Sequence, residues 1–179
     1  MVEVKQKELF DRRAREVRST CKAGGVGCKV TTGEGHTIVT DELAERGGTN
    51  TGAAPLYHLA ASLAACQTVQ IHKVAEAMRF EHGDINIDWS ATTDLIEGME
   101  FTANGVMHFC EAKLIIDIET NESEKKIERL KKLSEDRCPV SRLFIEAGYS
   151  PKMTWNVLPM KVWKIEAGWV WGRPRVDPV

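Results

Sequence analysis

Hydrophobic and polar residues follow strand-like and helix-like patterns along most of the chain. Near its start, three short β-like stretches, 14–22, 26–31 and 36–40, are separated by glycine turns. The pattern predicts a small β-meander.

A helical pattern follows the glycine-rich loop 46–55. It predicts a helix from Pro55 to about Met78, because proline suits a first helical turn, where its missing N–H would have no partner. Cys66 falls on the apolar side of this helix, so we expect its thiol to point into the core. The apolar stripe consists of Leu56, Leu59, Leu63, Gln70 and Val74.

The second half of the chain predicts strands and helices in turn. Apolar residues alternate in two stretches that look like long strands of an antiparallel sheet, and later stretches show helical spacing and then a last strand. These elements are strands over 85–89 and 108–118, a surface helix over 123–136, a short helix over 139–147 and a strand over 152–158. Beyond them, 162–171 has hairpin character and contains three tryptophans.

Length and charge narrow the class of protein. A chain of 179 residues with 42% hydrophobic content can bury one substantial core. The net charge of −2 gives no electrostatic reason to expect nucleic acid or an anionic membrane as partner. The N-terminus lacks the apolar run of a signal peptide, and no stretch is long enough to span a membrane. We therefore expect a cytoplasmic protein, in which cysteines are more often catalytic than structural.

Two of the five cysteines occupy helical settings that bear on reactivity. Cys138 comes at the start of a helix with Arg137 and Arg142 nearby, where unpaired N–H groups and the helix dipole favour a thiolate. Cys66 lies deep in a helix on an apolar stripe, where burial would raise its pKa. The pattern alone also fits Cys66 as a small core hydrophobe.

The other cysteines carry less chemistry. Cys21 and Cys28 have no paired histidines near them and lack the spacing of a zinc site, so we interpret them as ordinary strand residues. Cys110 shares a strand face with Leu114 and Ile116, which indicates core packing. The sequence indicates no metal site and no cofactor.

Four motifs in order resemble the OsmC/Ohr family. They are His36-Thr-Ile-Val-Thr-Asp-Glu, Gly47-Gly-Thr-Asn-Thr-Gly-Ala-Ala-Pro-Leu, Leu59-Ala-Ala-Ser-Leu-Ala-Ala-Cys66, and Cys138-Pro-Val about seventy residues later. The resemblance implies an α+β fold of curved antiparallel sheets wrapped around two central helices, in an intertwined homodimer. The resemblance ends near residue 158, so we predict one domain over 1–158 and expect the Trp-rich extension 159–179 to pack on the domain or dimer surface.

Many members of that family reduce organic hydroperoxides with a cysteine pair. By resemblance, Cys66 would attack the O–O bond and form a sulfenic acid, Cys138 would resolve it as a disulfide, and an external dithiol would reduce the pair again. An apolar pocket would favour alkyl hydroperoxides by burying their carbon chains.

The family pattern also includes an arginine that supports the thiolate and a glutamate about ten residues before the first cysteine. In this chain the residues ten and nine positions before Cys66 are Leu56 and Tyr57, so no glutamate stands there. Arg46 is the first candidate for the arginine and Arg18 the second, and Tyr57 or His58 would orient it. Because the glutamate is absent, an alternative function stays open, in which an interface pocket binds or carries a small apolar or sulfur-containing ligand.

Overall fold

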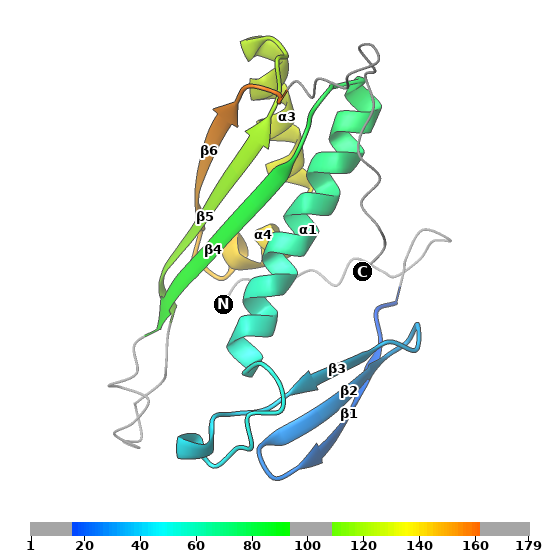
Figure 1. Ribbon diagram of the computed structural model, residues 1–179, viewed down its shortest axis with the longest axis vertical. Helices are drawn as coiled ribbons and strands as arrows, with labels where there is room; N and C mark the ends of the chain where they lie inside the picture. The colour runs from blue at the N-terminus through cyan, green and yellow to red at the C-terminus, as the bar shows by residue number, and fades with distance from the viewer. Residues whose placement is uncertain (1–15, 94–108, 162–179) are drawn as a thin grey trace, which may run out of the picture. The chain divides into compact units, whose positions relative to one another are not determined.

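The computed structural model describes residues 16–93 and 109–161. The chain forms two compact units, Met1–His58 and Leu59–Val179, and each is described by itself. Element labels are those of Figure 1.

The first unit contains a three-stranded antiparallel sheet in the order β1-β2-β3, visible in Figure 1 as a small ribbon. Its strands are β1 (Ser19–Gly24), β2 (Gly27–Thr32) and β3 (Thr37–Thr40), followed by the short 3-10 helix η1 (Ala44–Arg46). The β1–β2 turn passes through Gly25 at a φ of 67°, which suits glycine. The predicted meander is confirmed.

Helix α1 (Pro55–Met78) begins and ends where the sequence predicts. Its buried residues are Leu63, Gln67, Ile71, Val74 and Ala75. The predicted stripe was therefore wrong at two positions. Leu56, predicted to be buried, is 44% exposed, and the buried glutamine is Gln67, whereas the predicted Gln70 is only half-buried. The four-residue spacing from Leu63 through Gln67 to Ile71 places Gln67 on the buried face.

The second unit has a three-stranded sheet in the order β4-β5-β6, which lies beside the helices in Figure 1. Its strands are β4 (Ile85–Thr93), β5 (Phe109–Glu119) and β6 (Lys152–Leu158). β4 and β5 pair antiparallel, as predicted, but β5 and β6 are parallel. The prediction of purely antiparallel sheets is wrong here, because two helices lie between β5 and β6 in the chain and form the crossover that a parallel pair needs.

The two crossover helices are α3 (Glu124–Arg137) and α4 (Pro139–Glu146). They share one hydrophobic core with α1 and with alternate residues of β5. This core includes Leu63, Ile71, Leu114, Ile116, Ile118, Leu130 and Phe144. The second unit thus confirms a mixed α+β class.

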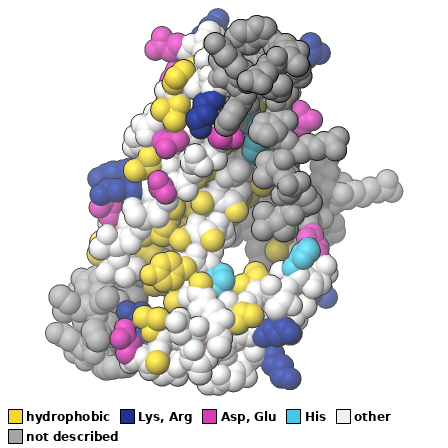
Figure 2. Space-filling model, in the orientation of Figure 1, with side chains coloured by type: hydrophobic (Ala, Val, Ile, Leu, Met, Phe, Trp, Pro, Cys, Tyr) yellow, Lys and Arg dark blue, Asp and Glu magenta, His cyan; other side chains and the backbone are white. Residues whose placement is uncertain are grey.

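Basic, acidic and hydrophobic side chains are interspersed on the face drawn in Figure 2, and no single sign of charge dominates it. Among the described residues, no helix has the length and hydropathy needed to cross a membrane. The predicted hairpin at 162–171 lies outside the described residues.

Candidate functional site

Cys66 and Cys138 come together in the second unit. Cys66 lies on α1, is half-buried and packs against the core, whereas Cys138 is a fully buried member of that core. The two thiols are close enough for Cys66 to contribute to the raised pKa of Cys138, although the residues are far apart in sequence. Neighbouring thiols are the starting arrangement that a disulfide needs.

Local sequence explains the position of Cys138. Pro139 ends α3 and begins α4, because proline cannot continue the first helix but fits the first turn of the next. Cys138 is the N-cap between them, and its sulfur accepts a hydrogen bond from the Ser141 backbone N–H at 3.4 Å. The break between the helices therefore holds this thiol in the core.

The expectation of a stabilised Cys138 thiolate is wrong. Burial, and after it the interaction with Cys66, raise the pKa of the Cys138 thiol to about 11 and outweigh the opposing effect of the Ser141 and Val140 N–H groups. Cys138 is therefore protonated at neutral pH.

The surroundings of the thiol pair are mostly apolar. Leu59, Leu63, Val140 and Phe144 belong to the same packed core as the two cysteines. Trp89 also packs there, and its ring centroid lies 6.5 Å from that of Phe144. This environment favours apolar molecules over strongly hydrated ones.

Two polar residues beside the cysteines were missed in the sequence. Gln67 follows Cys66 directly, and Ser141 lies in the first turn of the helix that Cys138 caps; both side chains are fully buried. The Gln67 amide and the Ser141 hydroxyl have no hydrogen-bond partner among the described residues. The sequence did carry a signal for Gln67, because it is a polar residue at the four-residue spacing of the apolar, buried side of the helix.

A family model described as OsmC-like protein matches residues 48–153. The matched segment is more than half of the chain and contains both Cys66 and Cys138. The chain belongs to the OsmC-like protein family.

Solved structures of this OsmC-like fold resemble the chain at low sequence identity. An OsmC-like protein from Mycoplasma pneumoniae is 16% identical, with a TM-score of 0.66 over 80% of this chain and 98% of its own. The organic hydroperoxide resistance protein OhrB of Bacillus subtilis is 19% identical, with a TM-score of 0.58 over 79% and 98%. An organic hydroperoxide resistance protein from Elizabethkingia anophelis is 17% identical, with a TM-score of 0.61 over 84% and 100%. No curated protein matches the sequence.

The other predicted site residues of this OsmC-like chain lie in the first unit. Arg46 is the last residue of η1, and its side chain is 59% exposed. It forms an ion pair at 3.7 Å with Glu42, which therefore supplies a carboxylate partner from four residues earlier in the chain. Arg18 pairs with Glu16 at 2.9 Å. Tyr57 is 70% exposed, whereas His58 is half-buried and its Nε2 has no described partner.

The glycine-rich loop before α1 is held by one buried carboxylate. Asp41 is 2% exposed and accepts hydrogen bonds from the backbone N–H groups of Glu42, Thr49 and Thr51. The Thr49 and Thr51 hydroxyls also donate to Asp41 Oδ2, at 2.7 and 2.8 Å. These hydrogen bonds hold the Asp41 pKa far below its usual range, and the bond from the Thr49 hydroxyl contributes most.

The remaining cysteines differ from expectation. Cys21 and Cys28 form a disulfide between β1 and β2 rather than serving as ordinary strand residues. Cys110 is exposed, not a core residue. The β4–β5 register shifts there, since Thr92 pairs with Glu111 but Thr93 pairs with Phe109, and Cys110 is the extra residue between them.

Proposed function

We propose that this OsmC-like protein reduces organic hydroperoxides through Cys66 and Cys138. The observation that carries the proposal is that Cys66 and Cys138 pack in one apolar core and that Cys66 is close enough to shift the pKa of Cys138. The names of the B. subtilis and E. anophelis structures, both organic hydroperoxide resistance proteins, support the same class of activity.

The reaction would begin at Cys66. Its thiolate attacks one oxygen of the hydroperoxide, the O–O bond breaks, and the products are a Cys66 sulfenic acid and an alcohol, which takes a proton. The Cys138 sulfur then attacks the sulfenic sulfur. A disulfide forms, and the hydroxyl leaves as water with the Cys138 proton. An external dithiol restores both thiols by two exchange steps.

Arg46 is the residue that we propose to support the Cys66 thiolate. Its ion pair with Glu42 would orient the guanidinium in place of the family glutamate, and Tyr57 or His58 would add a hydrogen bond. Arg18 is the alternative, since it also carries a carboxylate partner, Glu16. The Arg46→Ala and Arg18→Ala variants distinguish them, because only loss of the supporting arginine should lower kcat/KM for a hydroperoxide.

The first experiment is mass spectrometry of the reduced protein after one equivalent of cumene hydroperoxide, with hydrogen peroxide in parallel. We expect rapid formation of a Cys66–Cys138 disulfide with the organic peroxide and slower formation with hydrogen peroxide. The Cys66→Ser variant should form no such disulfide, and the Cys138→Ser variant should stop at an oxidised Cys66. Two unmodified thiols in the wild type would contradict the proposal.

The second candidate function is binding of a small apolar or sulfur-containing ligand. The observation that favours it is the sequence at Leu56 and Tyr57, where the family's glutamate is replaced. A bound organic molecule in native mass spectra, together with thiols that survive peroxide treatment, would support this function over peroxide reduction.

We also propose that the chain is a homodimer. Helix α1 exposes three large apolar side chains, with Leu56 at 44%, Tyr57 at 70% and Val69 at 47%. The resemblance to the OsmC/Ohr family implies this state, and a second copy of the chain would cover such exposed side chains. Light scattering at micromolar concentration should give twice the mass of the chain, and a monomeric mass would contradict the proposal.

A further inference from the structure

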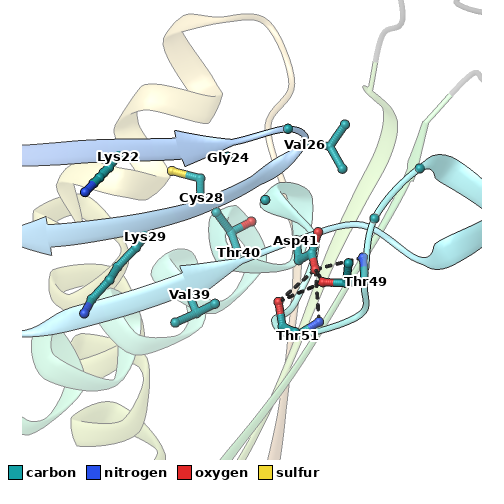
Figure 3. A pocket seen from close by; sticks show the side chains of 14 residues that line it. Lys22, Gly24, Val26, Cys28, Lys29, Val39, Thr40, Asp41, Thr49 and Thr51 are labelled. Atoms are coloured by element: carbon teal, nitrogen blue, oxygen red, sulfur yellow. Dashed lines mark hydrogen bonds between the residues drawn. The ribbon is translucent and has the colours of Figure 1, made fainter.

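A hollow of about 400 Å³ lies in the first unit, and Figure 3 shows its lining. The lining comes from the β1–β2 hairpin, from β3 and from the glycine-rich loop that precedes α1. Small-molecule sites have volumes of about 300–1,000 Å³, and the hollow falls within this range. The proposed peroxide chemistry does not use it, because neither Cys66 nor Cys138 belongs to the lining.

Glycine keeps this hollow open. Side chains alternate between the two faces of a strand, so position 24 shares a face with Lys22, and its cross-strand neighbour Gly27 shares that face with Lys29. A Cβ on Gly24 would meet no atom within 4 Å, and the Gly24 backbone lies outside the left-handed region that favours glycine. The backbone would therefore accept other residues at this position, and a large side chain there would fill space that the hollow leaves open.

Two lysines line the hollow on this same face. Lys22 and Lys29 are exposed and lie directly opposite each other across β1 and β2, whereas the sulfurs of Cys21 and Cys28 lie on the other face of the hairpin. No carboxylate within residues 16–93 and 109–161 forms an ion pair with either lysine. Like charges directly opposite each other destabilise an antiparallel pair. An anion bound between the two ammonium groups would offset this repulsion.

The acidic residue of the lining is Asp41, and its carboxylate is already occupied. Asp41 is 2% exposed, and its oxygens accept hydrogen bonds from Glu42, Thr49 and Thr51. In Figure 3, Asp41 lies with Thr49 and Thr51 at one end of the lining, and the two lysines lie toward the other end. The potential is therefore positive at the lysine end, which attracts anions.

We propose that this hollow binds a small phosphate ester, with the phosphate group between Lys22 and Lys29 and the organic part over Gly24 and Gly27. A phosphate monoester carries a charge of about −1.5 to −2 at pH 7 and three acceptor oxygens, so it can accept hydrogen bonds from both ammonium groups at once. Lysine binds phosphate as a point charge, and its flexible side chain can follow the ligand. A phosphate group alone is much smaller than the hollow, so the organic part of an ester would occupy the rest.

The test titrates the protein with glycerol 3-phosphate and follows the backbone amide signals of Gly25 and Gly27 by NMR. We expect these signals to shift with a Kd of about 1 mM, because both lysines are exposed to water and screened by salt. Inorganic phosphate should bind more weakly than the ester, and acetate and glycerol should leave the signals unchanged. Signals that do not shift at about 10 mM glycerol 3-phosphate would overturn the site. Equal affinities for phosphate and its ester would overturn the placement of the organic part.

Two variants separate the charge of the site from its room. The double variant Lys22→Gln with Lys29→Gln removes the charges, and Gly24→Leu fills the room but keeps both lysines. Each should weaken binding of glycerol 3-phosphate at least about tenfold, with thermal melting as the check that both are folded. Unchanged binding in the lysine variant would overturn the role of the charges, and unchanged binding in Gly24→Leu would overturn the placement in the hollow.

The matched control is Lys73→Gln, which removes an exposed lysine of α1 and the same amount of charge as one of the two lysine substitutions. It should bind glycerol 3-phosphate as the wild type does. A tenfold loss in Lys73→Gln as well would overturn the site, because the net charge of the protein would then explain the binding.

Discussion

Burial, and after it the interaction with the Cys66 thiol, raise the pKa of the Cys138 thiol to about 11. A thiol that stays protonated at neutral pH is a weak nucleophile, because the thiolate is the reactive form. This state suits a resolving cysteine, because attack by Cys138 has a purpose only after Cys66 is oxidised.

The first prediction concerns alkylation of reduced Cys138. At pH 8, a pKa of about 11 leaves about 0.1% of the thiol ionised, against about a quarter of a thiol with the ordinary pKa of about 8.5. We therefore expect iodoacetamide to modify Cys138 at least about 100-fold more slowly in the native protein than in urea. Peptide-mapped mass spectrometry over time measures both rates.

The pH profile supplies the control for this prediction. The native rate should keep rising to about pH 11, whereas the rate in urea should level off about two units lower. The free energy of unfolding should fall as the pH rises from the unfolded pKa of the thiol toward about 11. In this range the folded state still holds the Cys138 proton and the unfolded state has lost it, so raising the pH favours unfolding. A native rate that levels off near pH 8 would contradict the raised pKa.

The second prediction concerns Gln67, whose buried amide has no partner among the described residues. Met has a similar volume and no amide, so Gln67→Met should raise the free energy of unfolding by about 1 kcal/mol. Urea denaturation measures the change, and Gln70→Met at a half-buried position is the control. A loss of more than about 1 kcal/mol would mean that the amide is paired in solution.

The third prediction uses two glycines of the first unit. A Cβ on Gly48 would clash with the Glu42 carbonyl oxygen, whereas one on Gly24 would meet nothing within 4 Å. Gly48→Ala should therefore cost about 3 kcal/mol of stability, and Gly24→Ala should change it by less than about 0.5 kcal/mol. Thermal unfolding of the two variants beside the wild type checks this, and equal melting temperatures would contradict the tight contact.

Most elements could be predicted from the sequence because their signals are local. Pro55 and Pro139 indicate the starts of two helices, and glycines indicate the turns of the meander. The parallel β5–β6 pair could not be predicted, because strand direction depends on how α3 and α4 pack and not on the alternation within each strand.

The candidate site divides in the same way. The helical spacing predicts that Cys66 faces the core, and the structure confirms that it packs there. The state of Cys138 was misjudged, since the helix start and nearby arginines favour a thiolate but burial depends on the whole fold. Similarly, the Cys21–Cys28 bond depends on strand register, and Cys110 is exposed because of a local shift in register.

The last prediction concerns the pH dependence of stability through Asp41. Its pKa is lowered in the folded state by hydrogen bonds from Thr49, Thr51 and Glu42, so its stabilisation is present above the unfolded pKa of about 4 and is lost as the pH falls below that. Asp41→Asn should therefore unfold at lower urea concentration than the wild type at pH 7, and this gap should narrow at pH 3. Asp88→Asn, which removes the charge of an exposed strand residue, is the matched control. A gap between wild type and Asp41→Asn that stays constant from pH 7 to pH 3 would show that the carboxylate charge does not hold the loop.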